Sequence, residues 1–195
     1  MSRNTLVGRV ALALLLCVAA VCTSPTVGNS ALSADVEIPF ELVTKHILLK
    51  VRVNDSSPLS FILDTGATPA IIQIDRAKEL ELQLHGTVGV GGAGSGPVRR
   101  TGSFVKDATF TLPQLPDFSQ PVTLALPLTN LSAAFGHDVD GIIGTEFIKN
   151  FVVELDYQAR LIKLHEKGTF TYAGAGESLP IRFNPDGHPM IAAGS

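Results

Sequence analysis

The residues best suited to chemistry in this 195-residue chain are Asp64, Thr65 and Gly66. They come directly after an apolar run at 59–63, and apolar residues recur at every second position of 46–54, across a turn from that run. This pattern predicts a β-hairpin whose second strand ends at the Asp64 carboxylate. A carboxylate fixed at a strand end can accept a proton from water, which is general-base chemistry. Because Asp, Thr and Gly all favour turns, a turn without chemistry is the alternative.

Two glycine-containing segments follow this triplet. Residues 89–94 read Gly-Val-Gly-Gly-Ala-Gly and lie on a predicted hairpin, and residues 140–144 read Asp-Gly-Ile-Ile-Gly and lead into a short predicted helix. The first segment also fits the Gly-x-Gly-x-x-Gly pattern of dinucleotide sites, but such a site needs a helix directly after the glycines. Residues 95–100 predict a turn and a strand instead, so nucleotide binding is not expected. An ordinary flexible loop at 89–94 is the alternative.

These three segments, in this order, resemble the retropepsin-like aspartic proteases, the one-lobe relatives of pepsin. The resemblance covers about residues 36–166 and extends to bacterial exported members, which carry the segments seen here at 140–144 and at 154–157 (Glu-Leu-Asp-Tyr). It implies an all-β fold, a closed acid-protease barrel lobe with one or two short helices.

The resemblance also implies an aspartic endopeptidase that hydrolyses peptide bonds in extended polypeptides without a cofactor. One carboxylate deprotonates water and a second, protonated carboxyl polarises the carbonyl; two such groups held close share one proton, and aspartic proteases are the standard example. Asp64 would be one of the two, and a second lobe or a homodimer partner would supply the other. The alternative is a catalytically silent module of the same fold that binds peptides or serves as a scaffold.

Support roles for the neighbours of Asp64 follow from the same resemblance. Thr65 would hydrogen-bond across to the other lobe, and Gly66 would let the backbone approach the carboxylates closely. Ala67 stands where pepsin-like enzymes have a serine, and the Thr68 hydroxyl could compensate for its absence.

Two further groups of site residues are expected by resemblance. The substrate-binding flap would consist of Gly89, Val90, Gly91, Gly92, Ala93 and Gly94, a mobile hairpin that closes over the peptide. The residues that would pack beneath the active loop, in a structural role, are Ile142, Ile143 and Gly144.

Composition argues against other partners. The formal net charge is −3, without a Lys/Arg run or interleaved aromatic residues, so nucleic acid is not an expected partner. The five histidines are scattered, and no pair has the spacing of metal ligands, so no metal is expected. The loop at 137–140 is expected to be solvated.

The N-terminal residues predict export. Arg3 and Arg9 precede an apolar stretch at 10–21, which is shorter than the ~20 residues of a membrane-spanning helix and so indicates a signal peptide. A lipoprotein acylated at Cys22 and an uncleaved anchor are the alternatives. We expect a periplasmic or secreted mature protein with no membrane span and, because Cys17 and Cys22 are removed with the signal, no disulfide.

Three parts of the chain are expected: a signal peptide and leader at 1–34, the protease lobe at 35–170, and a linker with the start of a second lobe at 171–195. The last part is predicted because residues 179–192 repeat the strand–turn–strand pattern of 38–54, which suggests that the natural protein continues.

The remaining pattern predicts short strands and helices. Strands are expected at 38–43, 104–112, 122–126, 151–155, 160–165, 179–183 and 188–192, and helices at 75–82 and 145–150. No strand–helix–strand rhythm is present, so a doubly wound parallel sheet is not expected.

Overall fold

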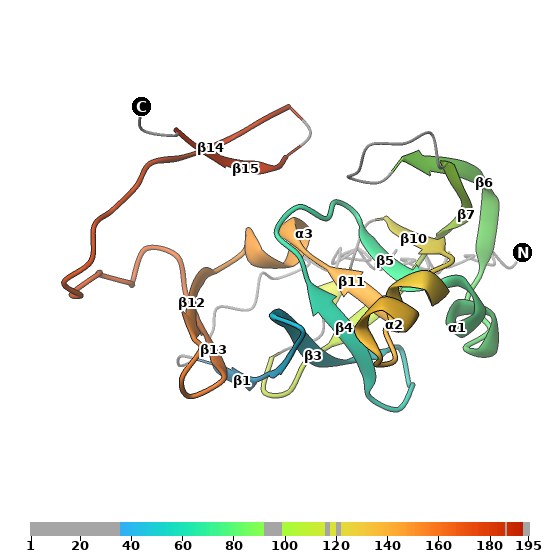
Figure 1. Cartoon of the computed structure of the whole chain (residues 1–195), viewed down its shortest axis with the longest axis horizontal. Helices are drawn as coiled ribbons and strands as arrows, with labels where there is room; N and C mark the ends of the chain where they lie inside the picture. The colour runs from blue at the N-terminus through green and yellow to red at the C-terminus, as the bar shows by residue number, and fades with distance from the viewer. Residues whose placement is uncertain (1–35, 92–98, 116–117, 120–121, 186, 193–195) are drawn as a thin grey trace, which may run out of the picture.

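The computed structural model describes residues 36–91, 99–115, 118–119, 122–185 and 187–192 (Figure 1). Most of the regular structure in this part is strand, so the predicted all-β class is confirmed. The helices are α1 (Ile74–Glu79), α2 (Thr129–Phe135) and α3 (Thr145–Ile148). The strands are β1 (Val36–Pro39), β2 (Glu41–Val43), β3 (His46–Val53), β4 (Leu59–Leu63), β5 (Ala70–Gln73), β6 (Leu84–Gly91), β7 (Arg99–Val105), β8 (Thr109–Thr111), β9 (Phe118–Ser119), β10 (Thr123–Leu126), β11 (Gly141–Ile143), β12 (Val152–Asp156), β13 (Leu161–His165), β14 (Ile181–Phe183) and β15 (Pro189–Ile191). No helix among the described residues is both long and apolar enough to cross a membrane.

The largest sheet has ten strands in the order β6-β7-β10-β5-β11-β4-β3-β8-β9, with β2 beside β3. The predicted closed barrel is wrong for the described strands, because their pairing follows an open path with β6 and β9 at its ends. Strand β9 has only two residues, too few to support a further ladder, and a shift in register between His85 and Val88 interrupts β6. Such irregularities bend a strand and end regular pairing.

Strand β4 lies inside the ten-stranded sheet, with antiparallel β3 on one side and parallel β11 on the other. Its side chains are buried on both faces: Phe61 belongs to the main hydrophobic cluster and Ile62 to a second cluster. The period of two in β3 has the same outcome, since Leu49 faces the main cluster and Leu48 the second. A strand covered on both faces is firmly placed, which matters for the residue that follows it.

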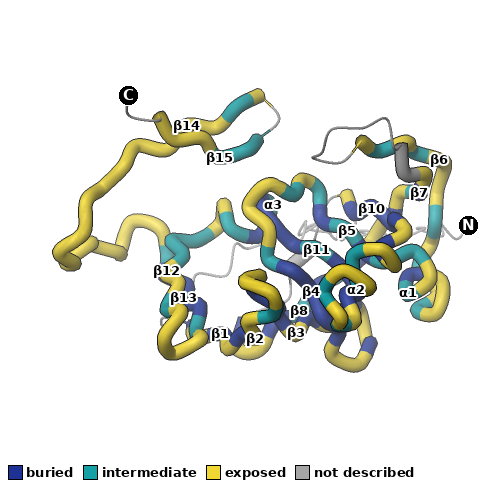
Figure 2. Tube along the Cα trace, viewed as in Figure 1, coloured by how far each residue is buried: buried dark blue, intermediate teal, exposed yellow. Residues whose placement is uncertain are grey.

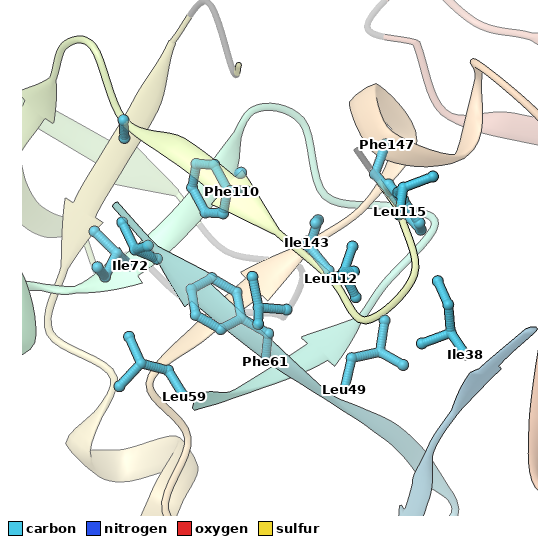
Figure 3. Close-up of a cluster of buried hydrophobic side chains, with 14 of the residues drawn as sticks. Ile38, Leu49, Leu59, Phe61, Ile72, Phe110, Leu112, Leu115, Ile143 and Phe147 are labelled. Atoms are coloured by element: carbon cyan, nitrogen blue, oxygen red, sulfur yellow. The ribbon is translucent and has the colours of Figure 1, made fainter. Parts of the chain in front are cut away.

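The main cluster takes buried side chains from two sheets and from two helices: β1, β3, β4, β5, β7, β8, β10, β11, β13, α1 and α3, some of which Figure 3 shows. Phe61 and Phe110 meet edge to face with ring centroids 5.9 Å apart, and neither is exposed to solvent. The second cluster is smaller and lies on the opposite side of β3 and β4. Its buried members are Leu48, Ile62, Leu124, Leu126, Leu128 and Val139. Leu131 and Phe135 of α2 pack against it.

Two smaller sheets complete the described chain. One has the order β1-β13-β12, and the other is the separate hairpin β14–β15. The hairpin is at the C-terminal end of a long exposed segment and is itself mostly exposed (Figure 2).

Several predicted boundaries are wrong for a local reason. The strand expected at 104–112 is two strands, β7 and β8, because Asp107 adopts a left-handed turn conformation with φ of 57°. The strand expected at 38–43 is broken at Phe40, whose N–H donates to Arg160 O (3.0 Å), so that β1 and β2 join different sheets.

Candidate active site

Asp64 is the first residue after β4, and three interactions fix the loop that it begins. Its N–H donates to Ile143 O (2.9 Å), its carbonyl accepts from Ala67 N–H (3.0 Å), and its Oδ1 accepts from Gly66 N–H (2.8 Å). The residue is nevertheless exposed. The backbone of Asp64 is therefore held by its neighbours, while its carboxyl group faces solvent.

The end of β11 and the start of α3 lie directly beneath this loop. Thr145 N–H donates to Ala67 O (3.1 Å), and the Thr145 hydroxyl donates to Thr65 O (2.7 Å). A Cβ added to Gly144 would lie 2.1 Å from Asp64 O and 2.5 Å from Ala67 O, so only glycine fits at this crossing. Thr145 therefore holds the loop by hydrogen bonds at two positions, Thr65 and Ala67.

The predicted support residues follow Asp64 in the loop, and the one with a described contact to the Asp64 carboxyl group is Gly66. A Cβ on Gly66 would lie 3.2 Å from Asp64 Oδ1, which is the close approach that glycine permits. The Thr68 hydroxyl donates to Ala67 O (2.9 Å), so its proton is not directed to the Asp64 carboxylate. Thr65 is exposed beside Asp64, and its carbonyl is held by Thr145.

The predicted flap coincides in part with β6. Gly89, Val90 and Gly91 pair with β7, whereas positions 92–94 lie outside the described residues. Val88 and Val90 are half-buried and pack against the second cluster, to which Ile142 also contributes. One face of the β6 strand therefore shares an apolar surface with Ile142, whereas Ile143 faces the main cluster.

Sequence reasoning missed Asp140, which was expected in a solvated loop. It is 8% exposed, and its carboxylate accepts from Ser60 N–H (Oδ2, 2.8 Å) and from Arg76 Nε (Oδ1, 2.9 Å). In the same loop Asp138 is exposed as expected, whereas His137 is half-buried. No spacing rule would have found the Arg76 contact, because the two residues are 64 positions apart.

Among the residues that the structure describes, no group of three or more His, Cys, Asp or Glu side chains could hold a metal ion.

Comparison with known proteins identifies the family. A family model described as aspartyl protease matches residues 49–147, about half of the chain, and this range contains Asp64, β11 and Gly144. The chain belongs to the aspartyl protease family.

One solved structure to which the chain is similar is a retropepsin-like aspartic protease from Rickettsia conorii. The identity is 15%, the TM-score is 0.43, and the match covers 67% of this chain and 89% of that one. No match was found among curated proteins.

Proposed function

We propose that this chain supplies one half of an aspartic endopeptidase and that Asp64 is its catalytic carboxylate. The observation that carries the proposal is that the N–H and the carbonyl of Asp64 are both hydrogen-bonded while the residue remains exposed. A catalytic group has to be held in place by its surroundings and still reach the substrate. A turn aspartate needs no such support from β11 and α3.

The proposed reaction uses two carboxyl groups that share a proton. The ionised one takes a proton from water while the water oxygen bonds to the peptide carbonyl carbon, and the carbonyl oxygen takes the proton of the other carboxyl. The carbon–nitrogen bond then breaks: the nitrogen leaves with the proton that came from water, and a hydroxyl of the tetrahedral intermediate gives its proton to the other carboxylate, which restores the shared proton. Asp64 is one member, and the other has to come from a second lobe or a second chain.

The hairpin β14–β15 favours a second lobe. In β2–β3, Leu42 lies opposite Ile47; in β14–β15, Phe183 lies opposite Pro189 in the corresponding place. The next residue along the chain faces a histidine in both hairpins. Val43, the last residue of β2, pairs with His46, and Asn184, directly after β14, donates its N–H to the carbonyl of His188 (3.0 Å). The second hairpin therefore repeats the register of the first.

This repeat gives the proposal a position to check. Leu49 corresponds to Ile191, and Asp64 follows Leu49 by 15 residues. A second catalytic aspartate is therefore expected about 15 residues after Ile191, within an Asp-Thr/Ser-Gly triplet. Reading the gene on from the codon for Ser195 tests this. A different residue there would leave a homodimer as the source, for which specific activity should fall on dilution as the dimers separate.

The β6–β7 hairpin is proposed as the flap that covers the bound peptide. Its support is the half-buried side of β6, where Val88 and Val90 face the second cluster while Gly89 and Gly91 have open space around them. Closing such a hairpin would exclude water from the dyad. Val90→Ala should raise KM for an extended peptide more than it lowers kcat; unchanged kinetics would argue against a flap at this place.

Export is also part of the proposal, supported by Arg3 and Arg9 before the apolar stretch at 10–21. N-terminal sequencing of the mature protein should find a start near residue 25 or near residue 35, after one of the two segments that end in a small residue (22–24 and 32–34). A mature chain that begins at Met1 would contradict export through a cleaved signal.

The central test is Asp64→Asn in the full-length protein. It keeps the shape of the side chain, removes the titrating group, and should lower peptidase activity by about 10³-fold or more. Asp55→Asn, in the exposed β3–β4 turn, is the matched control and should leave activity unchanged. Undiminished cleavage by Asp64→Asn would refute the mechanism. Peptide binding without cleavage by the wild-type protein would favour the silent module.

A further inference from the structure

The buried carboxylate of Asp140 connects three parts of the fold. Through Oδ2 it accepts from Ser60 N–H in β4, and through Oδ1 it accepts from Arg76 Nε in α1. Its backbone is also used, because its N–H donates to Ser60 O (2.8 Å) and its carbonyl accepts from Gln73 N–H at the end of β5 (2.7 Å). Every hydrogen-bonding group of Asp140 therefore has a partner on β4, β5 or α1.

Asp140 is also the residue directly before β11. Strand β11 runs parallel to β4 with Gly141 beside Phe61 and Ile143 beside Leu63, and at its far end the Ile143 carbonyl receives the Asp64 N–H. A strand that slipped by one residue would present a different carbonyl to Asp64 and turn its side chains to the other face. The contacts of Asp140 at the start of β11 therefore determine which carbonyl accepts the Asp64 N–H at the end of this strand.

The partner of Asp140 is itself held in place. Arg76 also bonds Glu79 on the next turn of α1, and the hydrogen bond to Asp140 is the main cause of the raised pKa of Arg76. The Asp140 side chain is only 11% exposed, whereas that of Arg76 is 37% exposed. Removing the arginine would leave a nearly buried carboxylate without its counter-charge, and a buried charge without a partner destabilises its surroundings.

We propose that Asp140 and Arg76 are positioning residues for Asp64, which act by fixing the register of β11 between β4 and β5. This inference rests on the proposed function for its effect on catalysis. Neither residue has a described hydrogen bond to the loop at 64–68. Their effect on Asp64 is indirect: the position of β11 determines where Ile143 O lies. Beyond Gly144 it also sets where Thr145 donates to the carbonyls of Thr65 and Ala67.

The test combines native-state hydrogen exchange with steady-state kinetics on the full-length protein. Asp140→Asn keeps an acceptor for Ser60 N–H but removes the charge that pairs with Arg76. The exchange rate of the Asp64 amide should rise roughly tenfold relative to that of Ile162, a fully buried residue of the separate sheet. The kcat should fall by about the same factor while KM changes less than about twofold.

Arg76→Gln provides a second variant if Asp140→Asn does not fold, because it changes the more exposed partner. It should move the same two readouts in the same direction by about threefold or more. Asp75→Asn is the matched control: it breaks an exposed ion pair with Lys78 (3.1 Å) on the same helix and should move neither readout.

Two results would overturn the proposal. One is an Asp64 amide that keeps its exchange rate in both variants. The other is an equal increase at Asp64 and at Ile162, since that would mean a general loss of stability. Because hydrogen exchange does not require turnover, a protein with no peptidase activity but with a selective change at Asp64 would retain the positioning role and lose only the proposed function.

Discussion

The hairpins β2–β3 and β14–β15 have matching pairing but opposite surroundings. In the first, Leu48 and Leu49 are 2% and 1% exposed; in the second, the corresponding Met190 and Ile191 are 55% and 59% exposed. Both hairpins have large apolar residues in their strands and a short turn between the strands. What differs is the neighbours: β3 is paired with β4 and β8 as well as β2, whereas β14 and β15 pair only with each other among the described strands.

This difference separates two properties of a strand pair, its register and its stability. Alternation and turn residues suffice to bring two segments into register, but the free energy comes from covering them, at about 25 cal/mol per Å² of buried apolar surface. A two-stranded hairpin alone is marginal in water. The large apolar residues exposed in the tail are Phe170, Tyr172, Leu179, Ile181, Phe183, Met190 and Ile191. Those in the hairpin strands, at 181–191, would be covered by the strands of the proposed second lobe that correspond to β4 and β8.

The largest expected effect is on stability. Leu49→Ala in β3 removes a fully covered side chain from the main cluster and should lower the free energy of unfolding by about 2–5 kcal/mol. Ile191→Ala, at the corresponding place in β15, should change it by less than about 0.5 kcal/mol in the 195-residue chain. Urea unfolding followed by circular dichroism measures both. Similar losses at the two positions would mean that the second hairpin is covered after all.

A smaller effect is expected at the turns. Thr44 and Lys45 join β2 to β3 with φ of 46° and 68°, a left-handed conformation that is costly for both side chains, whereas the second hairpin has Gly187 at φ 84°. Lys45→Gly should stabilise the protein by about 0.5–1 kcal/mol. Glycine removes the free-energy cost of the left-handed conformation, and the greater entropy that it gives the unfolded chain offsets part of this gain. Thermal unfolding measures the gain, and a lower Tm would show that the Lys45 side chain contributes more than its backbone costs.

The parts of this fold that could be predicted from the sequence have strong local patterns. Strand β4 begins and ends where its apolar run does, and the period of two in β3 gave its bounds to within one residue. The position of Asp64 at a strand end followed from these two strands alone. The family resemblance then predicted the crossing of Gly144 beneath the loop, a contact between residues 80 positions apart that no local pattern contains.

The elements that could not be predicted have weak local signals. Strand β5 has four residues and runs directly into α1, so its apolar residues look like the start of the helix. Helix α2 has no side-chain cap at its N-terminus and no fully buried residue, and only the left-handed Gly136 marks its end. The burial of Asp140 depends on Arg76 and Ser60, which are distant in sequence, and tertiary partners of this kind leave no periodicity.

The smallest expected effect is also the most direct check of the comparison. Removing residues 177–195 deletes the whole second hairpin while leaving Tyr172 and the sheet β1-β13-β12 in place. Because the strands of this hairpin contain no fully buried residue, the free energy of unfolding should change by less than about 0.5 kcal/mol. Hydrogen exchange in β3 and β4 should be unaffected as well. A loss of 1 kcal/mol or more would mean that the hairpin packs on the lobe to which it is joined, so its apolar side chains would already have a partner. The case for a second lobe would then rest on the repeated register alone. No change would leave those side chains uncovered, and an exposed cluster of large apolar residues on one short hairpin is what the proposed second lobe would cover.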